Sequence, residues 1–203
     1  MFYADDIPPT QKGRHHEVRA RGLREFAGLT RDDERLDPFA LAHYANLLVV
    51  SLDEIANLSD TTRSHLLGAG KEAWSGGAAS HKLADGRKLI ILNPTHGKNR
   101  QNATLMEEIS HVFLGHKPSR LAVETRNKKG EIIARDYNHE IEEEAYSTGA
   151  AALVPFTALR RMVASGKTSR EIARHFNVSK ALVEFRIKIL RLWGLYAERV
   201  ISG

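Results

Sequence analysis

The 203-residue sequence contains no cysteine. Disulfide frameworks, cysteine nucleophiles and thiolate metal sites are therefore excluded. No apolar run approaches the roughly 20 residues that a helix needs to cross a bilayer. The first residues, MFYADDIPPTQKGRHH, also lack the apolar stretch of a secretory signal peptide. We therefore expect a cytoplasmic protein that makes no membrane contact.

Aromatic residues are also scarce, at 7%, but apolar residues reach 42% of the chain. A chain of this length and composition can bury the core of one domain and still carry an appendage. Residues 1–36 are polar and include Pro8 and Pro9, so we expect a polar N-terminal tail there. We place a main domain at residues 37–157 and a separate C-terminal unit at residues 158–203.

Residues 104–116, TLMEEISHVFLGH, predict a helix that carries chemistry. In the zinc-peptidase pattern H-E-x-x-H, two histidines four residues apart share a helix face and hold one metal, and the glutamate activates water. Here Glu107 stands in the first histidine position, followed by Glu108 and, four residues after Glu107, by His111. Gly115 suits a left-handed helix end. The apolar stripe that would face a core consists of Leu105, Ile109, Val112 and Phe113.

Acidic and histidine residues at this spacing also occur on solvated helix faces, so a second segment is needed. Residues 140–155 read EIEEEAYSTGAAALVP. Its small residues permit close approach to another helix, and its carboxylates can supply a third ligand. The alternative reading is an acidic helix N-terminus stabilised by the helix dipole.

Together, the two segments resemble the ImmA/IrrE family of metallopeptidases, with its patterns H-E-x-x-H-x-x-x-G-H and E-x-x-A-x-x-F-A-A-x-L-L-x-P. The sequence departs from these patterns at Glu107, at Thr148 in place of an aromatic residue, and in a longer stretch between the helices. The resemblance covers about residues 46–195. The matching residues are Glu108, His111, Gly115, His116, Glu142, Ala145, Gly149, Ala150, Leu153 and Pro155.

The resemblance implies that Glu107, His111 and Glu142 hold a metal ion and that Glu108 is the general base. Glu144 is the reserve ligand if the helix register differs. The family implies Zn²⁺, while oxygen-rich ligation shifts the preference toward Mn²⁺. Two carboxylates also weaken the Lewis acidity of the ion.

Four other histidines are expected to play no part in binding metal. We interpret His116 as a helix-end residue that interacts with carbonyl groups, and His139 as exposed. The pair His15 and His16 lies in the polar N-terminal segment, where we expect no site.

Between these landmarks the sequence predicts a helix at residues 38–56, capped by Asp37, and a flexible stretch at residues 74–79. A turn at Asp85-Gly86 leads into an apolar strand at residues 88–92. By analogy with zinc peptidases this strand lies at the sheet edge, although a buried central strand fits the apolar run equally well. Residues 121–125 and 132–137 read as a hairpin.

The C-terminal third is basic. Residues 160–191 contain nine Lys and Arg against two Glu, a balance of +7, whereas the whole chain carries +5 and the rest about −2. Thr168 and Glu171 form a capping-box pattern, and Ser179 caps a helix at residues 180–193, which together predict a helix-turn-helix. Its predicted core is Ile172, Ala173, Phe176, Val178, Val183, Ile187 and Leu190.

This unit has two candidate roles. In ImmA/IrrE relatives a similar ending commonly packs against the domain or docks a partner, which is our first expectation. DNA is the second candidate partner, with Lys180, Glu184 and Lys188 as the residues that would face it.

The sequence thus predicts an α+β fold: a zincin-like, mostly helical metallopeptidase domain with a small β-sheet, followed by a helix-turn-helix-like unit. The resemblance implies a metal-dependent endopeptidase that cleaves a helix-turn-helix transcriptional repressor and so derepresses stress or mobile-element genes. The alternative, favoured by Glu107, is an impaired pseudo-peptidase or regulator that binds a repressor or DNA without cleavage.

Overall fold

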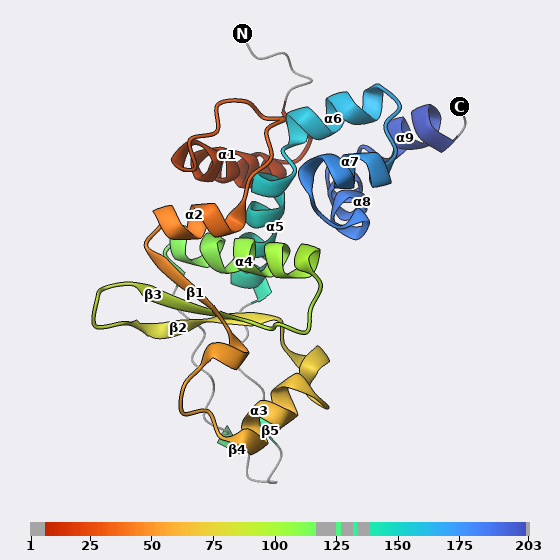
Figure 1. Ribbon diagram of the computed structural model, residues 1–203. Coiled ribbons are helices and arrows are strands. Elements are labelled where there is room, and N and C mark those ends of the chain that lie inside the picture. The colour runs from red at the N-terminus through yellow and green to blue at the C-terminus, as the bar shows by residue number, and fades with distance from the viewer. Residues whose placement is uncertain (1–6, 117–124, 127–131, 134–138, 202–203) are drawn as a thin grey trace.

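The computed structural model describes residues 7–116, 125–126, 132–133 and 139–201. Helices predominate and a small sheet lies in the first half of the chain (Figure 1), which confirms the predicted α+β class. Within these residues no helix is long and apolar enough to cross a membrane. The short segments between the main elements are η2 (Leu52–Glu54), α3 (Asp60–Leu67) and η3 (Lys71–Ala73).

The sheet has the strand order β1 (Leu47–Ser51), β3 (Lys88–Leu92), β2 (Gly76–Lys82). β1 runs parallel to β3, and β2 runs antiparallel to it. The strand predicted at residues 88–92 is confirmed, and it is the central strand. The prediction that it forms the edge is wrong, because β3 pairs on both sides. Among the described strands, β2 is an edge of this sheet.

Two other local predictions need correction. The helix expected at residues 38–56 stops early, because α2 covers only Pro38–Tyr44 and Asn46 then adopts a left-handed conformation (φ 58°) that leads into β1. The predicted cap is present, since the Asp37 side chain accepts from the Phe39 N–H at 2.9 Å. The stretch expected to be flexible at residues 74–79 instead contributes to β2.

The hairpin expected between the two site helices is described only in part. β4 (Thr125–Arg126) pairs antiparallel with β5 (Ile132–Ile133), as a hairpin requires. The rest of the predicted hairpin lies outside the described residues.

The two site helices are α4 (Lys98–Phe113) and α5 (His139–Leu153), and they pack directly on each other. α4 also lies on the sheet, against β2 and β3 (Figure 1). Gly115 has φ +70°, which confirms the left-handed end predicted for α4. Phe113 is 46% exposed, however, so only part of the predicted apolar stripe is buried.

The segment expected to be a polar tail, residues 1–36, contains the helix α1 (Gln11–Phe26) in its described part. The Thr10 hydroxyl caps this helix by accepting from the Gly13 N–H at 3.0 Å. One face of α1 packs on α5 and buries His16, Ala20, Leu23 and Arg24. Because two of these four residues are polar, the helical spacing does not stand out as an apolar stripe in the sequence.

Buried Arg24 explains how the end of α1 is held. Its guanidinium donates to the backbone carbonyls of Ala152, Arg31 and Glu34 at 2.8, 2.9 and 2.6 Å. These bonds satisfy carbonyl groups at the end of α5 and in the segment after α1 that would otherwise be costly to bury.

The C-terminal third consists of α6 (Phe156–Ala164), α7 (Ser169–Phe176), α8 (Lys180–Ile189), α9 (Trp193–Tyr196) and η4 (Ala197–Ile201). The capping box of Thr168 and Glu171 is confirmed, as is the Ser179 cap, and the seven predicted core residues are all buried. The assignment of these helices as a helix-turn-helix unit stays a prediction. So do the boundaries after residues 36 and 157, although one buried cluster includes side chains from both sides of residue 157.

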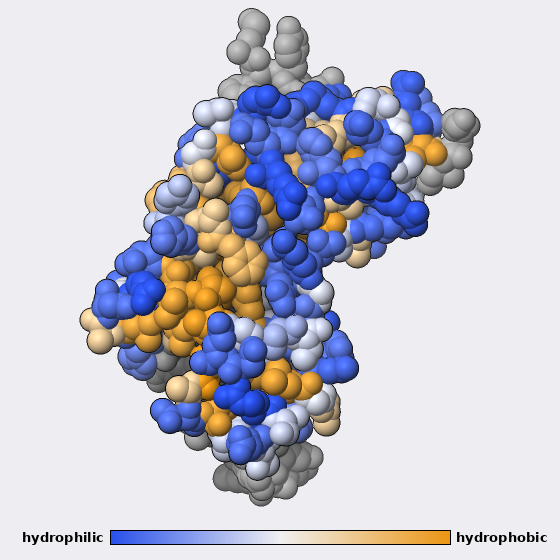
Figure 2. Space-filling view, viewed as in Figure 1, coloured by the Kyte–Doolittle hydropathy of each residue, from blue (hydrophilic) through white to orange (hydrophobic). Residues whose placement is uncertain are grey.

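Not every basic residue of this region lies on the surface. Arg186 is 1% exposed, pairs with Glu17 of α1 and donates to the Val154 carbonyl at 3.1 Å. Glu17 in turn accepts from the Phe156 N–H at 3.1 Å. This network ties α1 and the turn between α5 and α6 to α8. The outer surface over α6 to α8 is still mostly hydrophilic, in contrast to the apolar surface over β1 (Figure 2).

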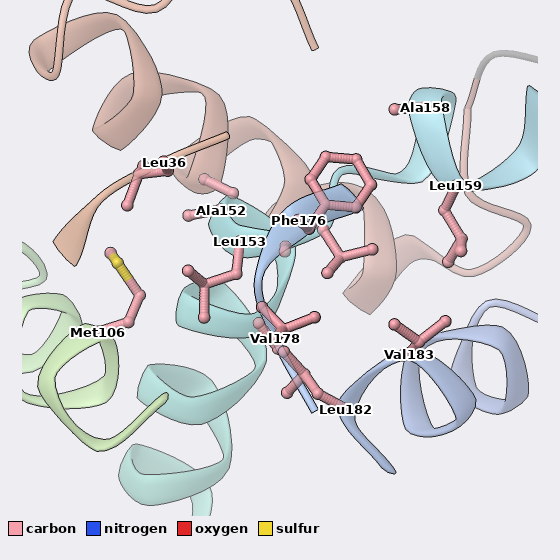
Figure 3. Close-up of a cluster of buried hydrophobic side chains, with 14 of the residues drawn as sticks. Leu36, Met106, Ala152, Leu153, Ala158, Leu159, Phe176, Val178, Leu182 and Val183 are labelled. Carbon is pink, nitrogen blue, oxygen red and sulfur yellow. The ribbon is translucent and has the colours of Figure 1, made fainter. Parts of the chain in front are cut away.

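Phe176 is 1% exposed and belongs to the buried cluster that also includes Leu153 and Leu159 (Figure 3). We expect Phe176→Ala to lower the free energy of unfolding by about 3–5 kcal/mol, because a buried aromatic side chain is lost. Urea denaturation measures this change. Phe26→Ala, which removes a ring that is 55% exposed, should cost less than about 1 kcal/mol; equal losses would contradict the central place of Phe176.

Candidate metal centre

Glu107 and His111 of α4 and Glu142 of α5 converge on one point. Each offers a ligand atom, and these atoms all lie within 4.8 Å of one another. His111 Nε2 lies 3.3 Å from Glu142 Oε2. Two ligand atoms on a tetrahedral zinc ion, each about 2.1 Å from the metal, would lie roughly 3.4 Å apart. The structure therefore brings together the three residues predicted as ligands, although their role as ligands stays a prediction.

The chemistry of this donor set fits a divalent cation. Burial and the charges of Glu108 and Glu142 raise the pKa of Glu107 to about 7, so ionising Glu107 is costly without a cation nearby. Burial lowers the pKa of His111, which favours the neutral imidazole that binds metals. Two carboxylates and one neutral imidazole are common zinc ligands and leave a fourth position open.

Glu108, the predicted base, lies at the same centre but faces the sheet. Burial and the charge of Glu142 raise its pKa to about 7, while Lys88 and a hydrogen bond from the Ala78 backbone oppose the increase. Ala78 belongs to the edge strand β2, and Lys88 is the first residue of β3. A carboxylate with a pKa near neutral can both accept and release a proton at physiological pH.

A pocket of about 470 Å³ opens beside Glu107, between α4, α5 and the start of α8. Tyr146 lines it and packs edge-to-face on Phe185, with ring centroids 5.2 Å apart. Burial and the charge of Glu107 raise the pKa of the Tyr146 phenol, so it stays protonated and can donate a hydrogen bond. Of the three converging residues, Glu107 lines this pocket, so the pocket adjoins the group that can hold a metal.

The interpretation of His116 as a residue that interacts with carbonyl groups misses its main contacts. Its ring Nδ1 lies 3.0 Å from His111 Nδ1, and its Nε2 lies 3.0 Å from Glu144 Oε2. Glu144, the reserve ligand, thus lies behind His116 and not in the group that can hold a metal. The sequence gives one hint of this arrangement, because His116 belongs to the family pattern.

His139 and His16 both lie outside this group of converging residues. His139 is exposed, as expected. His16 is buried in α1, where its Nδ1 lies 3.4 Å from the Thr148 hydroxyl. Burial lowers the pKa of His16 to about 4, so it is neutral at physiological pH. It lies outside the group that can hold a metal.

The convergence predicts one divalent ion per chain. His111→Ala and Glu142→Ala should each weaken binding by at least about tenfold, since each removes one of three ligands. Glu107→His should tighten zinc binding, because it restores an imidazole. Competition with a chromophoric chelator measures the affinities, and Glu143→Ala, which removes the exposed neighbouring carboxylate paired with Lys12, is the control. Full metal retention in His111→Ala would rule out this ligand set.

The raised carboxyl pKa values predict how the stability of the metal-free protein depends on pH. Glu107 and Glu108 ionise near pH 7 in the fold and near 4.5 when unfolded, so their stabilising contribution is complete below pH 4.5 and is lost as pH rises through 7. Relative to the Glu107→Gln/Glu108→Gln variant, the wild type should lose on the order of 5 kcal/mol between pH 5 and 8, about half of it from each carboxyl.

The lowered pKa values of His16 and His111 act in the opposite direction, because they make the fold more stable as pH rises. Comparison with this variant cancels that contribution. Urea denaturation in chelator gives the free energies of unfolding at each pH. Parallel pH profiles for the two proteins would show that the carboxyls are not buried together as described.

Comparison with known proteins places this geometry in a family. The model of the IrrE N-terminal-like domain of the M78 peptidases matches residues 69–188, which include α4, α5 and all three converging residues. A search of curated proteins finds no match. Because the family model covers more than half of the chain, this protein belongs to the M78 peptidase family with the IrrE N-terminal-like domain.

Proposed function

We propose that this protein is a metal-dependent endopeptidase that cleaves a helix-turn-helix transcriptional repressor in the cytoplasm and so derepresses stress or mobile-element genes. Its family has a metallopeptidase-like function. The observation that carries the proposal is the convergence of Glu107, His111 and Glu142 beside a second buried carboxyl, Glu108, whose pKa is about 7. A peptidase of this type requires three ligands and one base.

Glu107, His111 and Glu142 would hold the ion, which supplies Lewis acidity toward the scissile carbonyl and lowers the pKa of water. Glu108 takes the proton from the attacking water and later gives it to the leaving amine. The protonated phenol of Tyr146 lies near Glu107 and can donate to the oxygen that becomes negative during attack. We propose Zn²⁺ as the resident ion, with Mn²⁺ as the alternative suited to two carboxylates.

The substrate would bind in an extended form along β2. An edge strand can accept a peptide as an additional strand through backbone hydrogen bonds. The hydrogen bond between the Ala78 backbone and Glu108 supports this arrangement, because it links the base to this strand. A peptide lying there would pass the ligand group, and one of its side chains could enter the pocket beside Tyr146.

The C-terminal helices would dock the repressor. Two observations favour protein docking over DNA binding: Arg186 is buried, and Lys180 is paired with Glu184 at 3.1 Å. Both pairings reduce the basic charge that α8 presents outward, and phosphate binding depends on such charge. DNA binding therefore stays the second possibility for this unit.

The alternative function is that of a pseudo-peptidase that binds its partner without cutting it. Glu107 favours it, because a second carboxylate ligand reduces the Lewis acidity of the ion. The two functions differ in one measurable respect, which is turnover.

We expect Glu108→Gln to reduce repressor cleavage by at least about 100-fold, because the amide keeps the shape of the side chain but cannot accept the proton. Metal and repressor binding should persist. Mass spectrometry of a candidate repressor, incubated with the purified protein and Zn²⁺ or Mn²⁺, identifies the cut and gives its rate.

Glu143→Gln is the matched control, since it makes the same change at an exposed carboxylate and should leave the rate unchanged. Undiminished cleavage by Glu108→Gln would exclude Glu108 as the base. A wild-type protein that binds the repressor but cuts it with neither metal would establish the pseudo-peptidase.

A further inference from the structure

A chain of polar contacts leads from the metal centre to the N-terminal helix. His111 Nδ1 lies 3.0 Å from His116 Nδ1, and His116 Nε2 lies 3.0 Å from Glu144 Oε2. The other carboxylate oxygen of Glu144 pairs with Arg19 of α1. The His116 side chain is only 10% exposed, so its ring has little access to alternative partners in water. Arg19 lies outside residues 69–188, which the family model matches.

The positions of the protons follow from the far end of this chain. Glu144 is paired with Arg19, so its carboxylate can only accept, and His116 Nε2 must carry the proton that it donates. The Nδ1 of a neutral His116 is then an acceptor. Two ring nitrogens 3.0 Å apart need one proton between them, so His111 Nδ1 must be the donor. The Nε2 of a neutral His111 is left with a free lone pair.

That lone pair belongs to the atom on the metal side. His111 Nε2 is the atom that lies 3.3 Å from Glu142 Oε2, and both atoms would act as acceptors. Two facing acceptors repel each other unless a proton or a metal ion lies between them. The series of contacts from Arg19 through Glu144 and His116 therefore leaves His111 in the one tautomer whose Nε2 can bind a metal ion.

We propose that His116 and Glu144 are positioning residues that fix the tautomer and ring orientation of His111, and that Arg19 makes α1 part of the metal centre. This inference rests on the proposed function, because it takes His111 as a metal ligand. Hydrogen bonds to the non-ligating nitrogen of a metal-binding histidine generally orient the ring and raise its basicity. Here a second histidine lies between the ligand and the carboxylate.

The interface between α1 and α5 also provides a matched control. Lys12 pairs with Glu143 at 2.6 Å, so the same two helices carry a second ion pair, one residue away from Glu144 on α5. Among the described residues, neither Lys12 nor Glu143 forms a hydrogen bond or ion pair with His111 or His116. Loss of either ion pair loosens the same interface, but only loss of Glu144 breaks the chain.

The first test uses the metal-free wild-type protein. At pH 8, ¹⁵N NMR of the histidine rings should show His116 protonated at Nε2 and His111 protonated at Nδ1. His116 protonated at Nδ1 would overturn the proposal, because His116 would then donate the hydrogen bond to His111 instead of accepting it. This readout does not depend on catalysis or on bound metal.

The second test measures Zn²⁺ affinity and the visible spectrum of the Co²⁺-loaded protein. His116→Ala and Glu144→Gln should each weaken Zn²⁺ binding by about 10- to 100-fold and change the Co²⁺ bands. Arg19→Ala should act in the same direction, while Lys12→Ala and Glu143→Gln should stay within about twofold of the wild type. His116→Gln, whose side-chain carbonyl can accept from His111, should bind more tightly than His116→Ala.

Equal effects of the Glu144 and Glu143 substitutions would overturn the proposal, since they would trace the loss to helix packing. So would a His116→Gln variant no better than His116→Ala. A wild-type protein that binds no divalent ion would instead refute the proposed function, while the tautomers in the metal-free protein would still decide whether the chain exists.

Discussion

The close approach of α4 and α5 is the constraint on which the metal centre depends. A Cβ atom at Gly149 would lie 3.1 Å from the Met106 carbonyl oxygen and 3.2 Å from Ser110 Oγ. Because the nearest of these atoms belongs to the backbone, a side chain at this position would require the two helices to separate by a few tenths of an ångström. Gly149 and Glu142 are seven residues apart and lie on one face of α5, so the depth at which Gly149 packs also sets how close Glu142 comes to His111.

This packing concentrates negative charge where water has little access. Burial and the charges of neighbouring carboxylates raise the pKa of both Glu107 and Glu108, and Lys88 partly offsets this effect at Glu108. A buried carboxylate without a cation either keeps its proton or destabilises the fold. The same arrangement favours a bound divalent ion, since the ion relieves the repulsion. The second carboxylate thus strengthens the demand for a cation while it reduces the Lewis acidity of that cation.

Features of the fold with a short-range cause could be predicted from the sequence. They include the Gly115 helix end, the strand at residues 88–92 and the Thr168 capping box, and the spacing of Glu107 and His111 placed both on one helix face. Features that depend on distant partners could not. In the sequence Arg186 has the features of a surface charge, because its partners Glu17 and the Val154 carbonyl lie far from it along the chain. The sheet order is a second example. β1 occupies one side of β3 and leaves β2 at an edge, but the sequence predicts one long helix where α2 and β1 lie.

Helix α1 shows how such distant partners change the reading of a residue. One turn of α1 contacts both α5 and α8. His16 lies beside Thr148 and Arg19 pairs with Glu144, both on α5, while Glu17 pairs with Arg186 on α8. Thr148 stands where the ImmA/IrrE pattern has an aromatic residue, and it is fully buried. A threonine is small enough to leave room for the buried imidazole of His16, whereas an aromatic ring at position 148 would compete for that space. The small side chain at position 148 and the burial of His16 in α1 therefore depend on each other. The same turn of α1 also carries Arg19, which pairs with Glu144.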